Sequence, residues 1–216
     1  MHRILQAATL LMACATGVAQ ANPTLHGPTP YRRASASPFW GMPGLALDTL
    51  EDGALNLAGV TPLTGFVLPP GPSTDSVDAD DGAVDGLGTG GHSWWTPERT
   101  LEIAFDAGVL GSLPRHVGLC WTDGRDIVTF EAFGPDGASL GTLTGDHPDL
   151  RSDGRTAEDR FYGVSNHAGI SRITISSSPP WNGVEVDHIQ YVLPAPHALA
   201  LFAFGALAPR PRRTHR

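Results

Sequence analysis

Residues 128–143 read VTFEAFGPDGASLGTL and predict a β-hairpin. Val128, Phe130 and Ala132 alternate with polar residues, which is typical of a strand with one buried face. The Gly-Pro-Asp-Gly turn at 134–137 then leads into a second short apolar run, as in a hairpin. The same alternation recurs along the chain over residues 100–106, 116–121, 172–176 and 184–191.

Short strands broken by Gly, Pro and Asp, without a long 3.6-residue periodicity, predict an all-β chain. We expect a single antiparallel β-sandwich of jelly-roll type, flanked by an N-terminal signal helix and a short C-terminal apolar helix. In the last strand the apolar phase switches near Asp187-His188, which predicts a bulge. The expected segments are a signal peptide (1–21), a loose N-terminal lead (22–47), the sandwich (48–193) and a sorting tail (194–216).

Charge is distributed unevenly along the 216 residues. All 14 basic residues are Arg, against 22 acidic residues, which gives a net charge of −8. The two ends contain five of the Arg and no acid, so residues 22–193 keep nine Arg and a net charge of −13. A body this acidic is a poor partner for nucleic acid. The absence of Lys excludes a Schiff-base lysine and a P-loop.

The N-terminus predicts export. A basic start at Arg3 precedes a short apolar run, and Ala19-Gln20-Ala21 forms a small-residue cleavage site. We therefore expect a mature chain that begins at Asn22. The alternative is a lipoprotein signal that ends at Cys14, in which case lipidation would anchor the protein to a membrane.

The C-terminus has three features in a fixed order. Pro194-Ala195-Pro196 precedes an apolar run over 198–208, and the cluster Arg210, Arg212 and Arg213 follows. As a helix the run would span only about 16 Å, roughly half of a bilayer core. The order resembles the PEP-CTERM sorting tail, with Pro-Ala-Pro where that family has Pro-Glu-Pro. The resemblance implies a membrane-bound, exosortase-type sorting enzyme as partner, and transient membrane contact through the termini.

The body also resembles PEP-CTERM proteins. Segments that resemble uncharacterised bodies of this family from planctomycete-like bacteria lie at 50–53, 74–78, 156–164, 169–173 and 184–191. Together they cover most of residues 48–192. The resemblance implies an exported, tail-sorted β-sandwich at the cell surface, on the outer membrane or in the extracellular matrix, and it implies no known activity.

An acidic loop, defined here as residues 74–92, is the first candidate metal site. Calcium takes six to eight hard oxygen ligands, which Asp-rich loops with Gly turns supply. The alternative is a solvated acidic loop without an ion. The candidate ligands in this loop are Asp75, Asp78, Asp80, Asp81 and Asp85.

A second candidate calcium site joins two strands. Glu51 and Asp52 follow a strand expected over 45–50, and Asp187 lies in the last strand. The segments Leu-Glu-Asp-Gly and Val-Asp-His-Ile around them resemble those of jelly-roll carbohydrate-binding modules. The resemblance implies that the two strands meet and that their carboxylates hold a structural calcium ion. The alternative is that these carboxylates face solvent at the sheet edges.

Aromatic residues provide candidate sugar contacts. A sugar ring can stack its apolar face on an aromatic side chain while polar groups hold its hydroxyls. The candidates are Trp94, Trp95, Tyr162 and Trp181, with one of the two adjacent tryptophans expected in the core. These residues make an extracellular polysaccharide the expected ligand.

No catalytic motif stands out. The sequence contains no His-Glu-x-x-His, and its Gly-Ala-Ser-Leu-Gly at 137–141 lies in the predicted hairpin, not at a strand-to-helix turn. Cys120, the one Cys of the expected mature body, is predicted to be a small buried apolar residue without a disulfide partner. We therefore expect a non-catalytic protein that binds glycan or builds matrix, with Ca²⁺ as its expected cofactor. Two alternatives are a glycan hydrolase with paired carboxylates and a matrix protein without a ligand.

Overall fold

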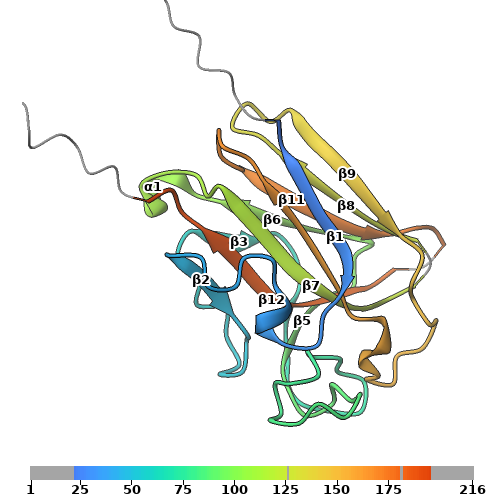
Figure 1. Cartoon of the computed structure of the whole chain (residues 1–216). Helices are drawn as coiled ribbons and strands as arrows, with labels where there is room; N and C mark the ends of the chain where they lie inside the picture. Colours follow the sequence, from blue (N-terminus) through green and yellow to red (C-terminus); the bar gives the residue numbers. More distant parts are fainter. Residues whose placement is uncertain (1–21, 126, 181, 196–216) are drawn as a thin grey trace, which may run out of the picture.

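The computed structural model describes residues 22–125, 127–180 and 182–195. It is an antiparallel β-sandwich of two sheets (Figure 1), which confirms the predicted fold class. A short α-helix, α1 (Ala107–Leu110), and two 3₁₀ turns, η1 (Ala34–Ala36) and η2 (Thr156–Glu158), connect the strands. The strands are β1 (Thr24–Pro30), β2 (Leu45–Asp48), β3 (Val60–Pro62), β4 (Phe66–Leu68), β5 (Ser93–Thr96), β6 (Thr100–Phe105), β7 (His116–Gly124), β8 (Val128–Phe133), β9 (Ser139–Gly145), β10 (Arg160–Ser165), β11 (Arg172–Ser177) and β12 (Val184–Val192).

The larger sheet has the strand order β1-β10-β7-β12-β5-β4, and β2 pairs with β12 outside this path. The smaller sheet has the order β3-β6-β11-β8-β9. From β5 onward the chain crosses between the sheets at nearly every connection, and the predicted hairpin β8–β9 is the exception. This crossing pattern is typical of a jelly roll and brings β5, β7 and β12 side by side in the larger sheet.

The core lies between the sheets and follows from the alternation in the sequence. In β6, β8 and β11 every second residue is buried, so the strands predicted from period two are confirmed. Trp121 on β7 and Tyr162 on β10 are the largest side chains of this core, and both are fully buried.

Strand β12 is buried on both faces. Val184, Val186 and Ile189 belong to the core between the sheets, while Glu185 and Asp187 point to the opposite, outer face of the larger sheet. The pairing of β12 with β7 shifts register after Asp187, and His188 has a left-handed φ of 48°. The predicted bulge at this point is therefore confirmed, and it explains the switch of apolar phase.

A second, smaller core covers the outer face of the larger sheet. Cys120 and Phe161 of the sheet pack there with Tyr31, Phe39 and Val77, and all five are fully buried. The prediction that Cys120 is a small buried apolar residue is confirmed. This layer places the acidic loop against β12, at the lower end of the sheet in Figure 1.

The expectation of a loose lead over 22–47 is wrong. Residues 24–30 form β1, which pairs with β10 at the edge of the larger sheet, and Tyr31 and Phe39 then cover the outer face. Pro, Ser and Gly in this segment give it an irregular backbone, but its isolated aromatic residues fix it to the sheet.

Both termini of the sequence carry predictions that fall largely outside the described residues. These include the cleavage site at Ala19 and Ala21, the flanking helices, and Pro196 with Arg210, Arg212 and Arg213. Pro194 and Ala195 are described and follow β12 without forming a strand or helix. Among the described helices, none has the length and apolar character needed to cross a membrane.

Candidate functional site

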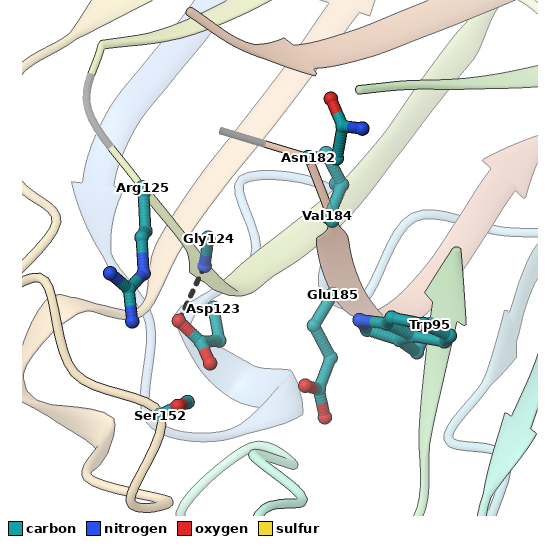
Figure 2. Close-up of a pocket in the computed structure, with 9 residues that line it drawn as sticks. Trp95, Asp123, Gly124, Arg125, Ser152, Asn182, Val184 and Glu185 are labelled. Atoms are coloured by element: carbon teal, nitrogen blue, oxygen red, sulfur yellow. Dashed lines mark hydrogen bonds between the residues drawn. The ribbon is translucent and has the colours of Figure 1, made fainter. Parts of the chain in front are cut away.

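A groove on the outer face of the larger sheet is lined by four shared residues, Trp95, Asp123, Ser152 and Glu185. It consists of two adjoining cavities of about 190 Å³ and 300 Å³. We call it the Trp95 groove. Figure 2 shows the first cavity, with the side chains of Asp123 and Glu185 pointing the same way and Trp95 beside Glu185.

Strand register explains how these side chains meet. Glu185 on β12 lies opposite Trp95 on β5 and opposite Asp123 on β7. On the other side of β5, Trp95 lies opposite Phe66 on β4. Directly opposite residues share a face, with Cβ atoms about 4.5–5.5 Å apart. The four strands therefore present a continuous row with two aromatic residues at one end and two carboxyl groups at the other.

The aromatic half of the row is partly open to solvent. Phe66 is 51% exposed, and its ring meets the half-buried Trp95 ring edge to face, with centroids 5.6 Å apart. Leu68 and Ser73 complete the cavity on this side. Arg125 and Asn182 line the cavity at the acidic end of the row.

The acidic half of the row is strongly desolvated. The Glu185 carboxyl accepts hydrogen bonds from the Asp75 backbone N–H (2.7 Å) and the Ser93 hydroxyl, and burial raises its pKa to about 8. The Asp123 carboxyl accepts a bond from the Gly124 N–H (2.5 Å), and burial raises its pKa to about 7. Near neutral pH such carboxyl groups can both donate and accept hydrogen bonds.

The acidic loop is fixed to the sheet beside this groove by buried carboxylates. Asp187 accepts bonds from the N–H groups of Val77 (3.0 Å) and His188 (2.6 Å). Asp78 accepts bonds from the N–H groups of Asp85 (3.0 Å) and Gly86 (2.8 Å). Because these carboxylates satisfy loop amides, they hold the fold of the loop itself.

Asp80, Asp187 and His188 form a compact group, with one potential ligand atom of each within 4.8 Å of the others. The His188 Nε2 donates to Asp80 (2.9 Å), and its Nδ1 is hydrogen-bonded to the Tyr31 hydroxyl (3.0 Å). Both ring nitrogens therefore have protein partners, and hydrogen bonding accounts for the group.

Four other predicted calcium ligands do not converge, namely Glu51, Asp52, Asp81 and Asp85. Strand β2 does pair with β12, but Glu51 accepts a bond from the His92 N–H (2.7 Å) instead of facing Asp187. Asp52 is exposed and accepts bonds from the Ala54 N–H and the Asn56 side chain. Two members of the acidic loop, Asp81 and Asp85, are also exposed, and each bonds an amide two residues further on.

The predicted sugar contacts separate into three groups. Trp94 packs on the main core, and its indole N–H donates to the Thr64 carbonyl (3.0 Å), whereas Trp95 lines the groove. The prediction for Tyr162 is wrong, because this side chain is fully buried in the core. Its hydroxyl is instead hydrogen-bonded to His147 (2.7 Å). The predicted contact Trp181 lies outside the described residues.

The contact of His147 with the core predicts a contribution to stability that is lost in acid. Burial lowers the pKa of His147 from 6.5 to about 4, so the unfolded chain takes up a proton before the folded chain does. His147 should therefore remove stability as the pH falls from 6.5 to 4. We expect the melting temperature of the wild type, minus that of His147→Gln, to shrink over this range. A difference that stays constant with pH would contradict the prediction.

The sequence alone did not identify Phe66, Asp123, Ser152 or Glu185 as groove residues. These residues come together only through the register of the strands that carry them. Phe66 and Glu185 are 119 positions apart, and a single sequence does not show how such distant strands pair. Comparison of the chain with protein-family models and with curated proteins finds no match.

Proposed function

We propose that this protein is an exported, non-catalytic β-sandwich of the cell surface or extracellular matrix that binds glycan in the Trp95 groove. The observation that supports the proposal is the row of Phe66, Trp95, Glu185 and Asp123 across four neighbouring strands. A sugar ring has the same division, with an apolar C–H face and a rim of hydroxyl groups. Aromatic residues would take the face, and the carboxyl groups would take the hydroxyls.

Size and charge narrow the class of ligand. Ligand sites usually have roughly 300–1,000 Å³, and one cavity lies at the lower limit of this range while the other lies below it, so the groove suits one or two sugar units of a chain. Its carboxyl groups belong to a body with a net charge of −13, which would repel acidic sugars. We therefore propose a neutral polysaccharide as the ligand.

Export and tail sorting are part of this proposal and depend on the sequence of the two ends. The cleavage site at Ala19 and Ala21 supports secretion, and Pro194-Ala195-Pro196 with the Arg cluster supports processing by a membrane enzyme. Sequencing the N-terminus of secreted material tests the first part, with Asn22 as the expected first residue. A chain secreted with Met1 intact would contradict it.

Removing the Trp95 ring should weaken glycan binding about tenfold or more, because burying a large apolar side chain contributes roughly 1.5–3 kcal/mol and each 1.4 kcal/mol is a factor of ten. The measurement is a glycan array followed by calorimetry with the best ligand, comparing the wild type with Trp95→Ala. Trp40→Ala is the matched control, since Trp40 is 56% exposed and lies outside the groove. Equal losses in the two variants, or no glycan bound by the wild type, would contradict the proposal.

A glycan hydrolase is the second candidate, favoured by the direct opposition of Asp123 and Glu185 at the end of the aromatic row. Glycoside hydrolysis uses two carboxyl groups that flank the bond. The wild type would then release reducing ends from the bound polysaccharide, and Asp123→Asn and Glu185→Gln would each abolish the release. Binding without release would leave the non-catalytic function, and absence of both would favour a matrix protein without a ligand.

A further inference from the structure

Several buried oxygen atoms on the larger sheet and the acidic loop lack hydrogen-bond partners. Among the described residues, nine buried side-chain N or O atoms lack a partner, and four of them belong to Asp75, Thr122 and Asp159. Both carboxylate oxygens of Asp159 are unpartnered although the residue is only 1% exposed. Leaving a buried acceptor unsatisfied destabilises the fold, and more so when the group is charged. Such atoms call for a ligand that the protein itself does not supply.

Strand pairing brings Asp159 to Thr122. In the antiparallel pair of β10 and β7, Phe161 lies opposite Cys120. Continuing this register by one pair beyond Arg160 and Trp121 predicts that Asp159, which directly precedes β10, lies beside Thr122 on the face of Phe161 and Cys120. The carbonyl of Asp159 accepts a bond from the Tyr31 N–H (3.2 Å), which fixes the backbone at this point.

The acidic loop brings Asp75 to the same place from above the sheet. The Asp75 N–H donates to Glu185 (2.7 Å), whose strand neighbour on β7 is Asp123, the residue after Thr122. Asp75 is 2% exposed, and its Oδ1 lacks a partner. Asp75 is also the largest charged influence on Asp159. These links bring residues from β7, the start of β10 and the loop, each with an unpartnered buried oxygen, to the same end of the larger sheet.

The charges in this region repel one another. Burial raises the pKa of Asp159 well above its usual value, and the carboxylates of Asp75 and Asp187 raise it further. Burial and the Glu185 carboxylate raise the pKa of Asp75 to about 9. The strongest charged influences on Asp159 are all carboxylates, so a cation would relieve both the repulsion and the missing hydrogen bonds.

We propose that Asp75, Thr122 and Asp159 form a buried calcium site. Their four unpartnered atoms are all hard oxygens, which favours Ca²⁺ over metals that select sulfur or imidazole. Backbone carbonyls and water would complete a shell of about six to eight oxygens. The ion ties the acidic loop to β7 and β10 and stabilises the fold by binding only the folded state. Of the calcium ligands predicted from the sequence, this site includes Asp75 but neither Glu51 nor Asp52.

The test is thermal unfolding of the purified protein with EGTA and with CaCl₂, together with calorimetric titration of CaCl₂. Calcium at about 100 times its Kd should raise the melting temperature of the wild type by roughly 5–10 °C. Asp159→Asn should abolish the rise, and in EGTA this variant should be at least as stable as the wild type because it removes a buried like charge. Asp52→Asn is the matched control and should respond as the wild type does, since Asp52 is exposed in its own turn.

Thr122→Val keeps the side-chain shape and tests the site if Asp159→Asn fails to fold. It should weaken calcium binding in the calorimeter without lowering the melting temperature in EGTA. Wild-type protein that binds no calcium would overturn the proposal. An undiminished calcium response in Asp159→Asn, or unchanged calcium affinity in Thr122→Val, would overturn it equally. A loss of glycan binding alone would not, because the groove and the calcium site are read out separately.

Discussion

Replacing Phe161 by alanine should lower the free energy of unfolding by about 3–5 kcal/mol, the range for deleting a buried Phe side chain. Phe161 is fully buried on the outer face of the larger sheet. Its ring stacks on Tyr31 at 5.7 Å and meets Phe39 edge to face at 5.5 Å. Both partners belong to the segment between β1 and β2, so the substitution would also release the layer that covers this face.

Urea denaturation of Phe161→Ala and of Phe66→Ala measures the effect against a matched control. Phe66 is 51% exposed, so its removal should cost less than about 1 kcal/mol. Limited proteolysis should also cut the Phe161→Ala variant faster between residues 31 and 44. A loss below about 1 kcal/mol for Phe161→Ala would contradict the prediction, because it would mean that the fully buried outer layer does not pack as a core.

Strands β6, β8 and β11 of the smaller sheet were predictable because each buries only one face. In β6, β8 and β11 the apolar residues fall at every second position, and the turn at 134–137 gives the hairpin. The bulge at Asp187-His188 was also visible, since a bulge moves the apolar residues of β12 to the other phase. In these elements the local sequence and the tertiary packing require the same pattern.

The N-terminal lead could not be predicted in the same way. Strand β1 contains Gly27, Pro28 and Pro30 and has no apolar alternation, so its sequence is typical of a loop. It becomes a strand because β10 offers an edge to pair with and because Tyr31 and Phe39 fill the outer layer. Tertiary contacts outweigh local preference here, and a single sequence does not reveal them.

The sequence predicted the types of residue in the candidate sites but not which residues belong to each site. An acidic loop with five Asp indicated a metal, and Asp75 does reach the buried region. Asp159 had no local signal, because it follows Glu158 in a short polar turn and meets Asp75 only through the fold. When ligands come from three segments of the chain, the topology of the fold brings them together. Spacing along the sequence can therefore identify only the ligands that lie within one segment.

Replacing Gly27 by alanine should destabilise the fold by about 3 kcal/mol or more, from backbone strain together with a steric clash. Gly27 has a φ of 104°, a conformation that residues with a side chain rarely adopt. A Cβ at this position would collide with the backbone carbonyl oxygen of Phe161 in the neighbouring strand. Since backbone atoms of a paired strand cannot rotate away, β1 would have to separate from β10.

Gly44→Ala isolates the strain from the clash. Gly44 also has a positive φ, 79°, but an added Cβ there meets nothing within 4 Å. Its substitution should cost only the strain, roughly 1–2 kcal/mol. Urea denaturation of both variants gives the two costs, and their difference measures how closely β1 approaches β10. Equal costs would show that residues 24–30 do not pair in solution as they do in this structure, whereas a larger cost for Gly27→Ala makes the lead an integral strand of the sandwich.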